Sequence, residues 1–115
     1  MLIIDGYMGK SRKLVEILKE KGTSEKDTLI LDSVGISELV RYGETYKVIA
    51  QNAIEHFLEK VLFNSRFKYV VLEFNASRDS IYSFKQLELR FKKEFILTVQ
   101  CPEKESQEEI KVYMI

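Results

Sequence analysis

Two glycines, a lysine and a serine follow the first apolar run of the chain at a spacing that suits a phosphate group. The run at residues 2–5 predicts a buried strand, and Gly6, Gly9, Lys10 and Ser11 come soon after it. Glycines let the backbone curl so that its N–H groups point inward, and a helix starting here would add a partial positive charge. Lysine contributes a full charge, and the serine hydroxyl can hold magnesium. We therefore predict a phosphate site at these four residues.

Three carboxylates end apolar segments and are candidates for the same edge of a sheet. Asp5, Asp32 and Glu73 close runs that we predict to be strands, and ligands of open α/β sheets bind at the C-terminal ends of strands. We predict Ser11 and Glu73 to lie at any magnesium ion bound with the phosphate. Gathered together, the three acids would suit magnesium-dependent nuclease or phosphatase chemistry. The interpretation that we favour is that acids at strand ends cap the helices that follow.

Alternating strand-like and helix-like segments must position these residues. We expect strands at residues 2–5, 28–32, 68–74, 94–100 and 110–115, and helices at 11–21, 45–63 and from a cap at Ser77 or Asp79 to about 93. This alternation is typical of an α/β domain with a mainly parallel sheet and helices on both faces. We predict one three-layer domain, residues 1–115, with a five-stranded sheet.

The last strand is expected to differ from the others. About nine residues separate it from the strand at 94–100, whereas a parallel crossover needs about a dozen or more. We therefore expect an antiparallel edge strand beside residues 94–100. Such an edge, or the face of the long helix at 45–63, would suit a homodimer or a protein partner.

Composition narrows the class of protein. The 115 residues are 45% hydrophobic and 31% charged, and 18 basic residues balance 18 acidic ones. These values argue against disorder and against a dedicated nucleic-acid binder, and no apolar run is long enough to span a membrane. The single cysteine, Cys101, and an opening "MLIIDG" without signal-peptide features favour a cytoplasmic protein. We assign no catalytic residue, because Cys101 has no histidine nearby in sequence and the only histidine, His56, lies beside the apolar stripe of the long helix, where a surface or boundary position is expected.

Gly9-Lys10-Ser11 after a first strand resembles the end of the P-loop NTPase signature, G-x-x-x-x-G-K-[ST]. The resemblance implies ATP or GTP as ligand, with Mg²⁺. The chain departs from the signature in having Ile4 at the first glycine, so that Gly6 would stand in for it and shorten the loop by two residues. Glu73 alone stands where the family has Asp or Asp-Glu. We therefore predict nucleotide or phosphate binding without efficient hydrolysis.

A second resemblance is to response-regulator receiver domains, which are flavodoxin-like. Asp5, Glu73, Thr98 and Lys111 correspond loosely to the functional positions of that family, although Glu73 replaces the phosphoacceptor aspartate. The alternative hypothesis is accordingly a non-enzymatic module for protein interaction or self-association, built on a P-loop-like or a flavodoxin/receiver-like scaffold.

Overall fold

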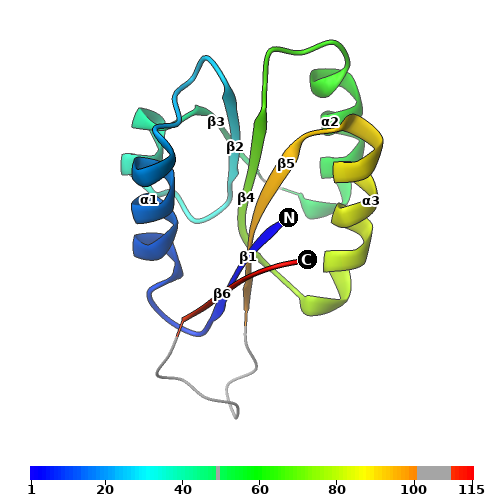
Figure 1. Cartoon of the computed structure of the whole chain (residues 1–115). Helices are drawn as coiled ribbons and strands as arrows, with labels where there is room; N and C mark the ends of the chain where they lie inside the picture. Colours follow the sequence, from blue (N-terminus) through cyan, green and yellow to red (C-terminus); the bar gives the residue numbers. More distant parts are fainter. Residues whose placement is uncertain (49, 101–109) are drawn as a thin grey trace.

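Strands form the middle layer of the computed structural model, which describes residues 1–48, 50–100 and 110–115. In those residues a six-stranded sheet has the order β3-β2-β4-β5-β1-β6 (Figure 1). The strands are β1 Leu2–Gly6, β2 Thr28–Asp32, β3 Glu44–Lys47, β4 Tyr69–Ala76, β5 Glu94–Gln100 and β6 Lys111–Met114. Neighbouring strands are parallel except for β6, which is antiparallel to β1. The predicted α/β class with an antiparallel edge strand is confirmed, with one strand more than expected.

Helices cover both faces of this sheet. On one side lie α1 (Lys10–Lys21) and the short 3-10 helix η1 (Ser37–Arg41), and on the other lie α2 (Ile54–Leu62) and α3 (Ile81–Phe91) (Figure 1). Two more 3-10 turns, η2 (Gln51–Ala53) and η3 (Arg78–Ser80), precede α2 and α3. The predicted three layers are therefore present.

Each face of the sheet has its own apolar core, and alternate residues of each strand point to one or the other. Ile4 and Ile96 pack with α1 through Leu14 and Leu18. The neighbouring positions in the strands, Ile3 among them, pack against α2 and α3. Because both faces are buried, the central strands are apolar at consecutive positions, as parallel strands usually are.

The long helix expected at residues 45–63 is wrong in its first part. Residues 44–47 form β3, which lies parallel to β2 and pairs Leu29 with Glu44. The helix α2 begins only at Ile54 and ends at Leu62. Val48 packs partly against the core below α2, so its apolar side chain continues the helical pattern without belonging to the helix. A four-residue strand is too short for its own periodicity to stand out from that pattern.

The last strand is an antiparallel edge strand as expected, but its neighbour is wrong. Tyr113 pairs with Ile3 of β1, not with a residue of β5. The reason is the order of the sheet, because β5 already has β4 on one side and β1 on the other. The chain ends lie beside each other, where the terminal ammonium of Met1 donates to the carbonyl oxygen of Ile115 and the amide of Ile115 donates to the carbonyl oxygen of Met1 (Figure 1).

Among the residues that the structure places, no helix has both the length and the apolar character needed to cross a membrane.

Candidate functional site

The predicted phosphate turn joins the end of β1 to the start of α1. Gly6 is the last residue of β1, Gly9 is the N-cap of α1 with φ 84°, and Lys10 is the first helical residue. A positive φ is unfavourable for residues with a Cβ atom, so the turn requires glycine at position 9. No acceptor in the described part of the chain binds the amides of Ser11 and Arg12. The turn therefore presents two unused donors at a helix N-terminus.

The ammonium group of Lys10 lies inside this turn. Its side chain is buried, with only 6% of the residue exposed. Nζ donates to the carbonyl oxygen of Gly6 at 2.5 Å and lies 3.4 Å from that of Tyr7. A full positive charge is thus fixed among the backbone groups of the turn, beside the N-terminus of α1.

A row of polar side chains lies on the α1 face of the sheet, one step beyond the apolar core. Asp32, Glu73 and Thr98 each follow by two residues a strand residue that packs below α1, so they face the same side. They are buried, with exposures of 4%, 1% and 0%. The row crosses β2, β4 and β5 at their C-terminal ends and approaches the start of α1.

Glu73 is the central carboxylate of this row. Its Oε1 accepts a hydrogen bond from the Thr98 hydroxyl at 2.7 Å, whereas its buried Oε2 has no hydrogen-bond partner among the described residues. Burial raises the pKa of Glu73 above its usual value, and the charge of Asp32 raises it further. The Thr98 hydrogen bond, the charge of Lys10 and the Ser11 hydroxyl act in the opposite direction. Lys10 and Ser11 are therefore close enough to Glu73 to influence its charge.

Thr98 is a partner of Glu73 that sequence reasoning did not assign to this site. The pairing of β4 with β5 is irregular between Leu72 and Ala76, and Asn75 there has φ 49°. The amide of Asn75 donates to the Thr98 hydroxyl at 3.3 Å, which ties the irregular segment to β5. The sequence hinted at Thr98 in two ways, as a polar residue inside the otherwise apolar run at 95–99 and as a position named with Glu73 by the receiver resemblance.

The three strand-end acids do not form one cluster. Asp32 accepts hydrogen bonds from the amides of Val34, Gly35 and Ile36 at 2.8–3.1 Å, so it holds the loop before η1 rather than capping the helix itself. Asp5 follows Ile3 by two residues and therefore faces the opposite side of the sheet. Within the described ranges, no group of three or more histidine, cysteine or acidic residues is placed to hold a metal.

Asp5 belongs instead to a separate pair on the α3 side. One of its oxygens accepts hydrogen bonds from Arg78 of η3, at 2.9 Å from Nη2 and 3.2 Å from Nε. The other oxygen is buried and has no hydrogen-bond partner in the described ranges of the chain. Burial, followed by the charge of Asp5, raises the pKa of the nearby Tyr113. This pair lies across the sheet from the turn and takes no part in the phosphate site.

The strand order of this sheet and the positions of its acidic residues differ from those of a receiver domain. Flavodoxin-like sheets have the order 2-1-3-4-5, in which the first strand lies between the second and third. Here β1 lies between β5 and β6. Asp5 and Glu73, which would share one site in a receiver, face opposite sides of the sheet. His56 is exposed on α2, and Cys101 lies outside the described residues.

Comparison with protein families, with characterised proteins and with solved structures finds no match for this chain.

Proposed function

We propose that this protein binds a nucleotide, or another phosphate ligand, at the turn from Gly6 to Ser11, without efficient hydrolysis. The observation that carries the proposal is the burial of Lys10 within a glycine turn at a helix N-terminus, close enough to Glu73 for its charge to act on that carboxylate. The amides of Ser11 and Arg12 and the Lys10 ammonium supply what an anionic oxygen needs. ATP and GTP are the ligands to which the P-loop resemblance points.

Magnesium would reconcile the phosphate with the carboxylate beside it. A phosphate bound near Lys10 would be repelled by ionised Glu73 unless a cation lay between them. Mg²⁺ is commonly held by one or two carboxylates, a hydroxyl and phosphate oxygens, with water completing its shell. Ser11 and Glu73 would fill the protein positions of that shell. The free Oε2 of Glu73 supports this role.

We expect weak hydrolysis because the carboxylates of the site are already occupied and cannot activate a water molecule. Glu73 would be committed to magnesium, and both oxygens of Asp32 already accept backbone amides. At the C-terminal ends of the described strands, no further carboxylate on the α1 face is therefore left to orient or deprotonate a water molecule. The proposed role is to hold a nucleotide rather than to turn it over.

Thermal unfolding with MgATP and MgGTP tests the proposal. A ligand at about 100 times its Kd stabilises the folded state by about 2.7 kcal/mol, which corresponds to a rise of several degrees in Tm for a chain of this size. We expect that rise for the wild type and its loss in Lys10→Met. Lys13→Met is the matched control, because Lys13 lies one helical turn later and its side chain is 43% exposed. Glu73→Gln should retain binding but lose its dependence on magnesium. No rise at millimolar nucleotide would refute the proposal.

A second candidate function, self-association, is favoured by β6. Among the strands that the structure describes, β6 pairs only with β1, and its four residues are all exposed. Val112, Met114 and Ile115 are 38%, 74% and 48% exposed, although they are apolar. The apolar side chains of α2, by contrast, pack on the sheet. The edge strand, rather than the helix, is therefore the better candidate for pairing with another chain.

A further inference from the structure

A groove of about 510 Å³ opens beside the proposed phosphate turn, between α1 and η1. Ser11 belongs to both the turn and the groove, so the two adjoin at this residue. The α1 residues along it run from Ser11 to Lys19, which is about 12 Å at 1.5 Å per residue. Its volume lies within the range of about 300–1,000 Å³ that is usual for small-molecule sites.

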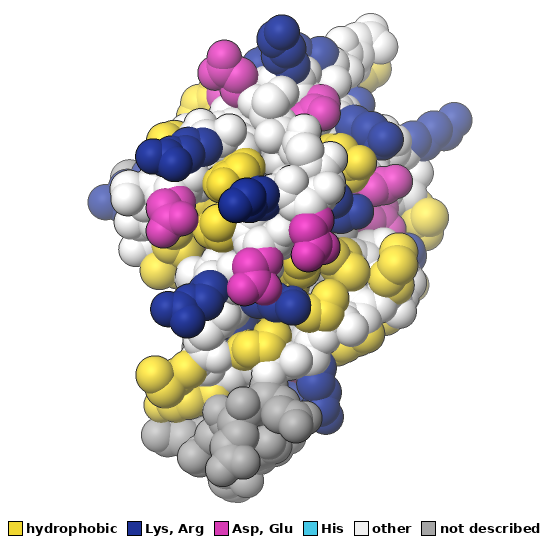
Figure 2. All heavy atoms as spheres, turned by 60° about the vertical axis from the view of Figure 1, so that its left-hand side comes forward, with side chains coloured by type: hydrophobic (Ala, Val, Ile, Leu, Met, Phe, Trp, Pro, Cys, Tyr) yellow, Lys and Arg dark blue, Asp and Glu magenta, His cyan; other side chains and the backbone are white. Residues whose placement is uncertain are grey.

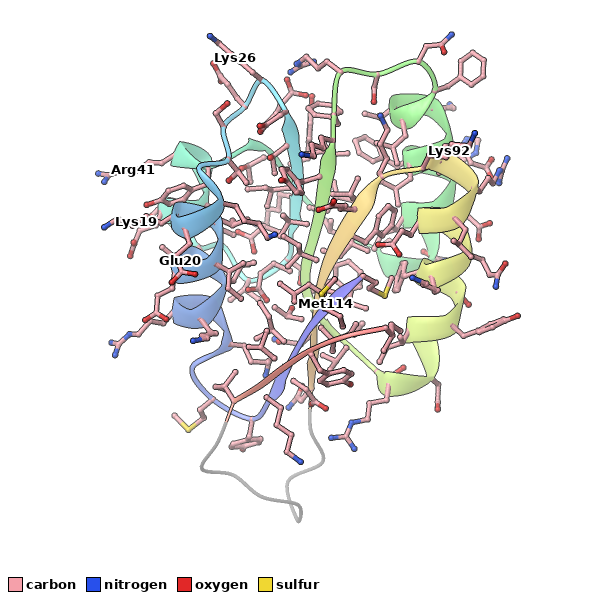
Figure 3. All side chains as sticks on the ribbon, viewed as in Figure 1. Lys19, Glu20, Lys26, Arg41, Lys92 and Met114 are labelled. Atoms are coloured by element: carbon pink, nitrogen blue, oxygen red, sulfur yellow. The ribbon has the colours of Figure 1, made fainter. Side chains whose placement is uncertain are left out.

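The lining of the groove includes basic, aromatic and acidic side chains. Arg12, Lys19 and Arg41 are cations that form no ion pair within the part of the chain that the structure describes. Figure 3 shows Lys19 and Arg41 extending from α1 and η1 on the same side of the molecule. Acidic and basic side chains are interspersed over this face of the protein, so no patch of one sign dominates it (Figure 2). The groove therefore lacks the uniform positive charge that a nucleic-acid strand needs.

An aromatic ring and carboxylates complete the lining. Tyr42 follows η1 and is half-buried, with its ring packed against the apolar core under α1. Glu38 lies on η1 and also lines the groove. Aromatic faces stack on bases, and carboxylates accept hydrogen bonds from ribose hydroxyls. These are the contacts that distinguish a nucleoside phosphate from a bare phosphate.

We infer that the groove between α1 and η1 binds the nucleoside part of a nucleotide whose phosphates occupy the turn. The inference rests on the proposed function and deepens it, because it names the ligand as a nucleotide rather than inorganic phosphate. The base stacks on Tyr42, Glu38 accepts from the ribose, and the unpaired cations at positions 12 and 41 face the ligand's remaining negative charge. The same phosphate chemistry without a base would leave the groove empty.

Calorimetric titration distinguishes phosphate binding at the turn from nucleoside binding in the groove. MgATP and MgGTP are compared with magnesium tripolyphosphate, which carries the phosphates alone. We expect at least one nucleotide to bind about tenfold or more tightly than tripolyphosphate, since base stacking on an aromatic ring contributes about 1–3 kcal/mol. Tyr42→Leu should remove that advantage and leave tripolyphosphate binding unchanged, while Tyr42→Phe should keep it. Tyr82→Leu, at a 73% exposed tyrosine of α3 on the opposite layer, is the control.

Equal affinity for nucleotide and tripolyphosphate would contradict nucleoside binding in the groove, and so would an unchanged nucleotide affinity in Tyr42→Leu. Neither result would contradict phosphate binding at the turn. Binding of none of the three ligands would overturn the proposed function and the groove together. The retention of tripolyphosphate binding in Tyr42→Leu also reports that this variant is folded.

Discussion

At the scale of single residues, a buried carboxylate with several charged and polar partners lies away from the proposed site. Glu88 is buried and receives the terminal ammonium of Met1 at 3.1 Å, Lys85 Nζ at 2.7 Å and the amide of Phe95 at 2.8 Å. Burial alone would raise the pKa of Glu88, but these donors outweigh burial and lower it. This carboxylate therefore joins α3 to the beginnings of β1 and β5.

Replacement of Glu88 by Gln should destabilise the protein by about 3 kcal/mol at pH 7, because it leaves the buried ammonium of Met1 without its counter-charge. Because folding lowers the pKa of Glu88, its contribution to the free energy of unfolding is present above the pKa of the unfolded chain, near 4.5. That contribution is lost as pH falls through the lower pKa of the folded protein. Urea unfolding should therefore give a difference between variant and wild type that shrinks below about pH 4.5.

Glu59→Gln is the matched control for this change. Glu59 pairs with Arg90 at 2.8 Å, but the two side chains are 37% and 57% exposed. Exposed ion pairs contribute at most about 1 kcal/mol, so this variant should remain close to the wild type. Equal losses of stability in the two variants would contradict the assigned importance of Glu88.

The candidate site was predictable from sequence only where its residues are close along the chain. Gly9, Lys10 and Ser11 needed no more than a strand, a glycine and a helix in succession. The positions of Asp5 and Glu73 depend on which face of the sheet each occupies. In fully buried strands the residues of both faces are apolar, so the sequence does not indicate which face a given residue occupies. The separation of Asp5 from Glu73 could therefore be learned only from the sheet.

At the scale of elements, the approach of β3 to β2 depends on Gly43. A Cβ atom at this position would lie 2.7 Å from side-chain atoms of Ile30 and 3.0 Å from the carbonyl oxygen of Thr28. Gly43→Ala should therefore lower the free energy of unfolding by about 1–3 kcal/mol, as overpacking in a core usually does. In the Ile30→Ala background the same change should cost less, because the nearest side-chain atoms are gone. Chemical denaturation of the four proteins of this cycle measures the coupling. Strict additivity would contradict the proposed clash.

Most elements could be located from sequence, whereas their neighbours in the sheet could not. The segments at 28–32 and 94–100 coincide with β2 and β5, and Gly22 ends α1 with φ 68° as a helix C-cap. Local patterns encode such features because strand, helix and cap each involve few consecutive residues. The placement of β6 beside β1 depends on which edge the rest of the sheet leaves open. That information is distributed over the whole chain.

At the scale of the whole molecule, the sheet has an edge that is well suited to pairing. The backbone N–H and C=O groups of Lys111 and Tyr113 point toward β1. This follows from the register of β6 on β1 and from the hydrogen bonds between Met1 and Ile115. Those of Val112 and Met114 consequently point away from the sheet. Met114 extends from this outer strand (Figure 3). With 18 basic and 18 acidic residues, the chain carries no net charge to oppose self-association.

We therefore expect two copies to pair antiparallel through β6 about a two-fold axis, giving a continuous sheet across the dimer. Light scattering after size exclusion should detect a dimer of about twice 13.5 kDa for the wild type. Val112→Pro should shift it to the monomer, because proline removes an outward N–H group without removing a hydrogen bond between β6 and β1. Val112→Ala, which keeps that group, is the control and should remain dimeric. A wild type that is monomeric at the highest attainable concentration would rule out the pairing, and it would leave the phosphate turn as the function to pursue.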